Sequence, residues 1–167
     1  MANRAKAFEK RFANDWERTV PDSLCYRLLD VMSGYKAISN AGDYICFKSP
    51  SCFIIDCKST EQNTFSVNFR QYDQMVKYMN IPGLHCGVII WFINHDKCVW
   101  VPIETFVKLK ADDKKSFNVK MIGSDEYFHI EIPSKKIRTY LSSDYENMVE
   151  YYRGKDYVTS RREQINV

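Results

Sequence analysis

Apolar residues at helical spacing open the chain. Phe8, Phe12 and Trp16 recur every four residues, which predicts a helix over residues 4–19. Residues 24–38 mix apolar and polar positions without a clear period. We interpret them as a helix or turn that leads into a short strand.

Short apolar runs between turn residues predict the strands. These runs are residues 35–38, 43–48, 52–59, 65–67, 86–93, 98–101 and 127–132. The run at 86–93 is almost continuously apolar, as expected of a central strand that is buried on both faces. Residues 98–101 are interpreted as its hairpin partner.

Three further helices are predicted in the rest of the chain. Asn68 is followed three residues later by Gln71, which is the spacing of a capping box. The helix that begins there is expected to bury Phe69, Tyr72, Val76 and Met79. Residues 102–108 predict a second helix and residues 144–152 a third. Residues 153–167 are polar and are interpreted as a tail that need not be ordered.

The order of these elements predicts an α/β domain in which helices flank a mixed β-sheet. A length of 167 residues, with 45% apolar and 14% aromatic residues, fits one folded domain over residues 1–152. The six cysteines form no CxxC pair and no Cys/His set, so we expect small buried apolar residues rather than disulfides or zinc ligands. No signal peptide and no apolar run near 18 residues is present, which predicts a soluble, cytoplasmic protein without a membrane partner.

Charge alone leaves the partner open. The net charge is only +3, which does not by itself indicate nucleic acid. Basic residues do cluster, at Arg4, Lys6, Lys10, Arg11, Lys114, Lys115, Lys135, Lys136, Arg138, Arg161 and Arg162. Such clusters are more often solvated surface than binding sites.

A carboxylate and an ammonium interrupt the strand at residues 52–59. Asp56 and Lys58 share one face, because side chains alternate along a strand. A hairpin that folds symmetrically about Ser49-Pro50 places Asp43 opposite Asp56, with Cβ atoms about 4.5–5.5 Å apart. Two carboxylates this close repel unless a proton or a cation lies between them, and Mg²⁺ is a suitable cation. The alternative is a surface hairpin end with an exposed Asp43 and an Asp56–Lys58 ion pair.

Asp43 and the segment Ile54-Ile55-Asp56-Cys57-Lys58 resemble the PD-(D/E)xK motif of the restriction-endonuclease-like nucleases. More specifically, residues 4–120 are similar to the RecU-type Holliday junction resolvases of Gram-positive bacteria and their phages. The matching motifs, in chain order, are Phe8-Glu9, Asp43-Tyr44 thirteen residues before Asp56, Phe65 with Gln74, and Gly87 followed by Val88-Ile89-Ile90-Trp91-Phe92. Asp56 stands where these resolvases carry Glu, and Ala41 where they often carry Thr.

The resemblance implies a restriction-endonuclease-like core and hydrolysis of a DNA phosphodiester that depends on Mg²⁺, with Mn²⁺ as a substitute. The implied metal ligands are Asp43, Asp56, the backbone carbonyl of Cys57, and Gln74. Lys58 would orient the attacking water, and Glu9 would support the metal site from the first helix or act as a further ligand. Without the resemblance, Glu9 and Gln74 would be interpreted as surface residues.

The resemblance also implies branched DNA as the partner. Two symmetric cuts resolve a four-way junction, and a homodimer supplies them directly. The candidate phosphate contacts are Arg4, Lys6, Lys10, Arg11, Lys135, Lys136 and Arg138. Two alternatives stay open: a related nuclease that acts on another DNA structure, and a DNA-binding module with an inactive site.

Overall fold

A six-stranded sheet forms the centre of the computed structural model, which describes the chain except for residues 1, 30–31, 34–35, 38–39, 139 and 166–167. The strand order is β1-β4-β5-β7-β8-β10. The strands are β1 (Leu24–Arg27), β4 (Tyr44–Lys48), β5 (Ser51–Thr60), β7 (Leu84–Phe92), β8 (Lys97–Pro102) and β10 (Ile130–Ile132). β5 and β7 are parallel and the other neighbours are antiparallel, so the sheet is mixed, as predicted.

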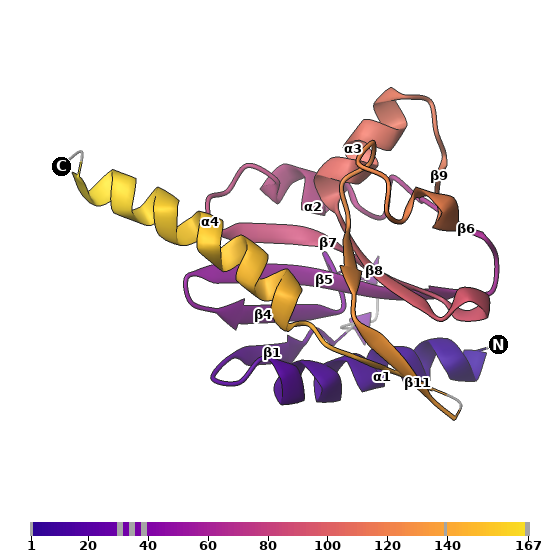
Figure 1. Cartoon of the computed structure of the whole chain (residues 1–167). Coiled ribbons are helices and arrows are strands. Elements are labelled where there is room, and N and C mark those ends of the chain that lie inside the picture. Colours follow the sequence, from indigo (N-terminus) through magenta and orange to yellow (C-terminus); the bar gives the residue numbers. More distant parts are fainter. Residues whose placement is uncertain (1, 30–31, 34–35, 38–39, 139, 166–167) are drawn as a thin grey trace.

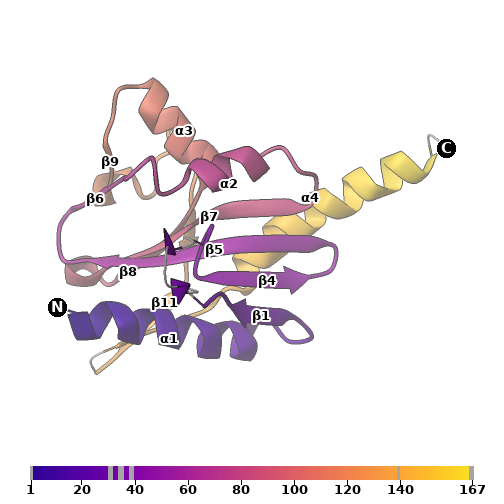
Figure 2. The ribbon, with the colours of Figure 1, turned by 180° about the vertical axis from the view of Figure 1, so that it is seen from behind.

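Helices cover both faces of this sheet (Figures 1 and 2). They are α1 (Ala2–Thr19), α2 (Asp73–Tyr78), α3 (Ile103–Ala111) and α4 (Glu146–Ile165). α1 and the first half of α4 pack on one face, and α2 and α3 pack on the other. The smaller elements are β2 (Met32–Ser33), β3 (Lys36–Ala37), β6 (Thr64–Ser66), β9 (Ser116–Asn118), β11 (Ser134–Ile137), β12 (Tyr140–Ser143), η1 (Ile93–His95) and η2 (Val119–Met121).

An aromatic core joins α1 to its face of the sheet. Phe8, Phe12 and Trp16 are each at most 4% exposed, which confirms the helical stripe predicted from their spacing. The ring centroid of Phe12 lies 4.9 Å from those of Tyr44 and Tyr145. Burying one such large apolar side chain contributes roughly 1.5–3 kcal/mol. This core therefore anchors α1 against β4.

A second core lies beneath α2 and α3. Met75 of α2 and Leu109 of α3 are fully buried, and Phe106 is 1% exposed. They belong to one cluster with Val88 and Ile90 of β7. Because the alternate residues of β7 pack in the α1 core, this strand is buried on both faces, as its continuous apolar run predicts.

Residues 24–27 form a strand, so the helix or turn predicted for them is wrong. Cys25 packs against the α1 core, whereas Leu24 and Tyr26 are 51% and 60% exposed. An edge strand with one covered face and apolar residues on both faces lacks the alternation that would identify it. Of the strand predicted at 35–38, β3 lies inside that range, and residues 35 and 38 lie outside the described residues.

The predicted capping box at Asn68 and Gln71 is also wrong. The N–H of Gln71 donates to the carbonyl of Asn68 in a turn, and α2 begins only at residue 73, without a side-chain cap. A helix that begins later buries a different face. Met75 is therefore fully buried, and Val76 is 38% exposed.

Helix α4 continues to Ile165, so residues 153–165 are helical rather than a separate polar tail. The carboxylate of Asp156 accepts the hydroxyl of Ser51 and lies 2.8 Å from Nε2 of His85. Nε of Arg153 donates to the carbonyl of Ser49 at 2.7 Å. These contacts attach α4 to the β4–β5 turn and to the start of β7, and beyond them the helix extends away from the sheet (Figure 1).

All six cysteines are free, as predicted, and four of them are buried. Sγ of Cys46 lies 3.5 Å from Sγ of Cys25 on the neighbouring strand. None of the helices in the described part of the chain has the length and apolar character needed to cross a membrane.

Candidate active site

The β4–β5 hairpin brings two carboxylates together. Tyr44 pairs with Ile55, Ile45 with Ile54 and Phe47 with Cys52. The predicted register is therefore confirmed. Asp43 immediately precedes this ladder and lies close enough to Asp56 for the charge of Asp56 to raise its pKa. The backbone of β5 also fixes Asp43: its N–H donates to the carbonyl of Ile55 at 2.9 Å, and its Oδ2 accepts the N–H of Cys57 at 2.7 Å.

Gly42 allows this close approach. A Cβ at this position would lie 2.9 Å from the carbonyl oxygen of Ile55 and 3.1 Å from Cγ2 of Ile54. The oxygen belongs to the backbone of a central strand and cannot move aside. Any larger residue at position 42 would therefore push the chain, and Asp43 with it, away from β5.

Asp56 is held from two sides. Its carboxylate is buried, with only 3% of the residue exposed. Nζ of Lys58 lies 3.0 Å from Oδ2 and 3.2 Å from Oδ1. The hydroxyl of Tyr72 donates to Oδ2 at 2.9 Å. The Asp56–Lys58 ion pair of the alternative interpretation is present, but Asp56 is buried and Asp43 is half-buried rather than exposed.

Tyr72 is the residue of this site that the sequence did not reveal. The helical pattern assigned it to the apolar core, where its ring does lie. Periodicity says which face a residue occupies, but not which polar atom its hydroxyl reaches. The absence of an obvious partner for a buried tyrosine hydroxyl was the one available signal.

The negative charge of Asp43 and Asp56 exceeds the positive charge beside them. Burial, followed by the neighbouring charge of Asp56, raises the pKa of Asp43 to about 7, even though the N–H of Cys57 acts in the opposite direction. Burial alone would lower the pKa of Lys58, but the charges of Asp56 and Asp43 raise it. One lysine thus faces two carboxylates. Such a pair keeps a proton or binds a cation.

The residues present fit a hard divalent cation. In a strand, the N–H and C=O of one residue point to the same side, so the Cys57 carbonyl is directed toward the side of Asp43. Within the described residues, no third His, Cys, Asp or Glu side chain joins the two carboxylates. Two carboxylates and a backbone carbonyl leave positions for water and a phosphate oxygen, which is the coordination that Mg²⁺ commonly adopts.

Glu9 and Gln74 are not joined to this pair. Glu9 forms an ion pair with Arg27, and its carbonyl accepts the hydroxyl of Tyr44 at 2.9 Å, on the α1 face of the sheet. Gln74 is exposed on α2. Among the described residues, neither side chain forms a hydrogen bond with Asp43 or Asp56. Their roles stay predictions from the resemblance.

Several of the predicted DNA contacts gather at one end of the sheet. Nζ of Lys136 lies 3.1 Å from Asp96, which follows β7, so the β11–β12 hairpin reaches the end of the sheet where β5 and β7 finish. The N-terminal half of α1 lies at the same end, because Phe8 packs 5.5 Å from Trp91. The exposed basic residues there are Lys6, Lys10, Lys135, Lys136 and Arg138.

Two predicted contacts differ from this group. Arg11 is half-buried, lies 3.0 Å from Asp15, and stacks 4.6 Å from the ring of Tyr140. These contacts engage its guanidinium within the protein. The side chain of Arg4, on the first turn of α1, lies outside the described side chains.

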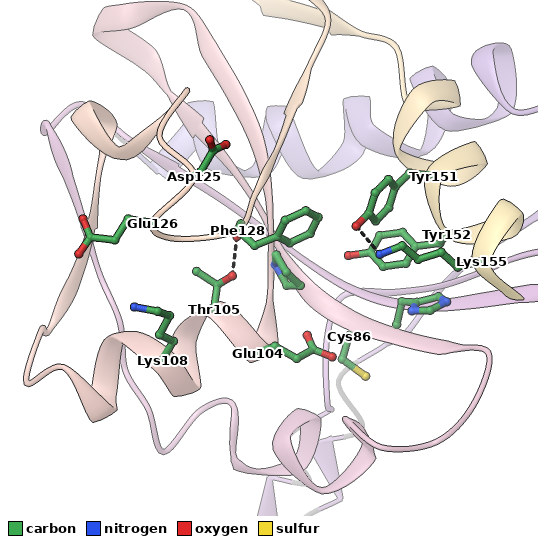
Figure 3. A pocket seen from close by; sticks show the side chains of 12 residues that line it. Cys86, Glu104, Thr105, Lys108, Asp125, Glu126, Phe128, Tyr151, Tyr152 and Lys155 are labelled. Atoms are coloured by element: carbon green, nitrogen blue, oxygen red, sulfur yellow. Dashed lines mark hydrogen bonds between the residues drawn. The ribbon is translucent and has the colours of Figure 1, made fainter. Parts of the chain in front are cut away.

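A separate cavity of about 480 Å³ lies between α3 and α4 (Figure 3). Phe128 and Tyr151 stack at its wall with ring centroids 5.5 Å apart. Its charged lining residues are Glu104, Lys108, Asp125, Glu126 and Lys155. This mixture of charges, away from the paired carboxylates, does not favour a DNA phosphate.

Comparisons with known proteins agree with the fold. No protein-family model and no curated protein matches the sequence. Among solved structures, the chain is similar to Hjc, a Holliday junction resolvase from the archaeal hyperthermophile Archaeoglobus fulgidus, with a TM-score of 0.53 and 11% identity. The match covers 69% of this chain and 88% of the Hjc chain. The predicted fold, a restriction-endonuclease-like core with a mixed sheet flanked by helices, is thereby confirmed.

Proposed function

We propose that the chain is a DNA endonuclease that depends on Mg²⁺, or Mn²⁺ in its place, and cuts four-way junctions. The observation that carries the proposal is the buried Asp56 beside the half-buried Asp43, with Lys58 two residues further along β5. The likeness to a Holliday junction resolvase supports the choice of substrate. Because one fold serves many functions, the chemistry of the site carries more weight than the fold.

Each residue of the pair has a task in this proposal. Asp43, Asp56 and the Cys57 carbonyl would hold a metal ion, which when bound lowers the pKa of a water and stabilises charge on the phosphate. Lys58 is one-third exposed, so its ammonium can contact both Asp56 and an incoming phosphate or water. Since Lys58 balances only one carboxylate, the remaining negative charge favours a cation.

DNA would lie across the end of the sheet where β5 and β7 finish. The exposed lysines of α1 and the tip of the β11–β12 hairpin border that end. Phosphate contacts of this kind position DNA without reading its sequence, and they weaken as salt rises. We therefore expect binding that depends on the shape of the DNA rather than on its sequence.

A junction has two strands to cut, so the proposal includes a homodimer with one site in each protomer. The order of the motifs around Asp43, Asp56 and Gln74 supports the RecU type. The proposal also includes the bacterial or phage origin and the cytoplasmic location that this resemblance implies. Light scattering during gel filtration would test the dimer. A mass of one chain at micromolar concentration, with or without junction DNA, would contradict it.

The central experiment compares a labelled four-way junction with a linear duplex of the same arms, each with Mg²⁺ and with EDTA. Asp56→Asn is the test variant. Asp112→Asn is its matched control, because Asp112 also accepts a tyrosine hydroxyl and pairs with a lysine, but lies outside the site. We expect paired symmetric nicks on the junction alone, lost in EDTA and in Asp56→Asn and kept in Asp112→Asn.

Other outcomes decide between the alternatives. Equal cutting of the linear duplex would indicate a related nuclease with another substrate. Tight junction binding without cutting would indicate a DNA-binding module with an inactive site. Wild-type cutting by a folded Asp56→Asn variant would contradict the site itself.

A further inference from the structure

Tyr72 lies beneath the candidate site, at the residue that precedes α2. It is 2% exposed, and its ring centroid lies 5.4 Å from that of Phe106 on α3. Its carbonyl accepts the N–H of Val76 at 3.0 Å, which joins its backbone to the first turn of α2. Packing and backbone contacts thus hold the ring, and with it the position of the hydroxyl.

The hydroxyl of Tyr72 forms a hydrogen bond with the carboxylate of Asp56, a proposed metal ligand. It donates to Oδ2 of Asp56 at 2.9 Å, from within the core. Nζ of Lys58 contacts the same oxygen at 3.0 Å, from a side chain that is one-third exposed. Asp56 is therefore oriented from the interior by Tyr72 and from the open side by Lys58.

The chemical type of the inner donor matters. A phenol hydroxyl fixes the direction of a carboxylate without cancelling its charge. A second lysine or arginine at this place would balance both Asp43 and Asp56, and the attraction for a divalent cation would be lost. Hydrogen-bond partners behind metal ligands commonly tune metal affinity by about 10–100-fold.

We propose that Tyr72 is a positioning residue whose hydroxyl sets the orientation of the Asp56 carboxylate for a divalent cation. The inference rests on the proposed function, because it requires that Asp43 and Asp56 bind a metal ion. The inference makes the site depend on Tyr72, a residue that lies outside the PD-(D/E)xK-like motif.

The test uses Tyr72→Phe, which removes one oxygen atom and keeps the ring. Tyr127→Phe is the matched control. Tyr127 is 1% exposed, belongs to the same core, and donates its hydroxyl to the carboxylate of Asp112 at 2.8 Å. The two variants lose the same kind of hydrogen bond, one inside the site and one outside it.

Mn²⁺ binding to the full chain, without DNA, is the direct measurement. Titration calorimetry or the EPR signal of free Mn²⁺ gives the affinity, and thermal unfolding in EDTA gives the stability. We expect Tyr72→Phe to weaken Mn²⁺ binding by about 10–100-fold and Tyr127→Phe to leave it unchanged, with similar unfolding temperatures in EDTA. Unchanged affinity in Tyr72→Phe, or an equal loss in Tyr127→Phe, would overturn the inference.

Two further variants separate the possible failures. If Tyr72→Phe does not fold, Phe106→Leu keeps the hydroxyl and loosens the ring that carries it. Weaker Mn²⁺ binding by that variant is expected, and wild-type affinity would overturn the inference. A different result would contradict the metal site itself: the wild type binds no Mn²⁺, or Asp56→Asn binds it as tightly as the wild type does. In that case both the proposed function and the role of Tyr72 are wrong.

Discussion

Two buried aspartates of this protein have opposite surroundings. Asp15 on α1 is 1% exposed and lies 3.0 Å from Arg11 and 3.2 Å from Arg18. Its Oδ2 also accepts the N–H of Ser143 at 2.9 Å, which ties α1 to the end of β12. One negative charge there faces two positive charges and a backbone donor.

Asp56 is 3% exposed, but around it negative charges outnumber positive charges. It shares a single lysine with a second carboxylate, that of Asp43, whose pKa is raised to about 7. Burial of a carboxylate alone therefore does not indicate function. An excess of donors indicates a structural role, whereas an excess of carboxylates indicates a site that takes up a proton or a cation.

Neutralising each aspartate in turn gives the largest expected contrast. Asp56→Asn should lower the junction cleavage rate by a factor on the order of 10³ or more, with little change in folding. Asp15→Asn should instead lower the free energy of unfolding by about 2 kcal/mol, because it disturbs a satisfied buried network. Single-turnover cleavage and urea unfolding measure the two effects, and equal stability losses in both variants would remove the distinction.

Removing the cation beside each aspartate is the second contrast. Lys58→Met should slow cleavage by about 10²–10³-fold, because the developing charge on the phosphate loses one donor. Arg18→Met removes a cation beside Asp15 and should leave the cleavage rate of the folded protein unchanged. If both variants cut at the wild-type rate, Lys58 has no part in the reaction.

The pH dependence of stability sharpens the comparison further. The folded pKa of Asp43, about 7, lies above its ordinary value of 3.8. Unfolding therefore releases a proton between these values, and the metal-free protein loses stability as the pH rises from about 4 to about 7. Asp43→Asn should be more stable than wild type in EDTA at pH 8, by about 2 kcal/mol after allowance for its partial exposure.

That advantage should shrink as the pH falls and vanish at about pH 3, below both pKa values, where Asp43 is protonated in the folded and the unfolded state. Thermal unfolding in EDTA across this pH range measures it. Excess Mg²⁺ at pH 8 should reverse the order of the two proteins, since only the wild type keeps both carboxylates. An equal gap between the two proteins at pH 4 and pH 8 would contradict the raised pKa.

The smallest effect concerns charges that face solvent. Lys135 and Arg138 are exposed on the β11–β12 hairpin. Replacing both with alanine should flatten the slope of log K against log[salt] for junction binding by about 2, one phosphate contact for each residue. Lys108→Ala is the control, because this lysine lies on α3 and pairs with Asp112 at the end of that helix. Fluorescence anisotropy at several salt concentrations measures the slope, and equal slopes would exclude this hairpin from the DNA contact.

The position of the paired carboxylates could be predicted because it depends on local rules. The alternation of side chains and a symmetric turn were sufficient to predict the register of β4 and β5, and with it that Asp43 and Asp56 lie close together. The central strand β7 was equally readable from its continuous apolar run.

Other features depend on how separate elements pack. The contact between Tyr72 and Asp56 requires the position of α2 on the sheet, which no local pattern supplies. The helix also includes the polar residues 153–165, where Arg153 contacts Ser49 of the β4–β5 turn and Asp156 contacts Ser51 and His85, all far away in the sequence. Strand β1 was not predicted because Cys25 on its covered face and Leu24 and Tyr26 on its exposed face are all apolar. The alternation of polar and apolar residues that identifies a strand is therefore missing.

The parallel pairing of β5 with β7 has a consequence for the order of folding. The β4–β5 hairpin joins neighbouring segments and closes only a short loop, whereas β7 reaches β5 only after a long crossover that contains α2. Asp43 and Asp56 can thus meet in an early hairpin, while Tyr72 arrives with the crossover. During synthesis the two carboxylates emerge before Tyr72, and the hydroxyl of Tyr72 can reach Asp56 only once the crossover has packed against the sheet.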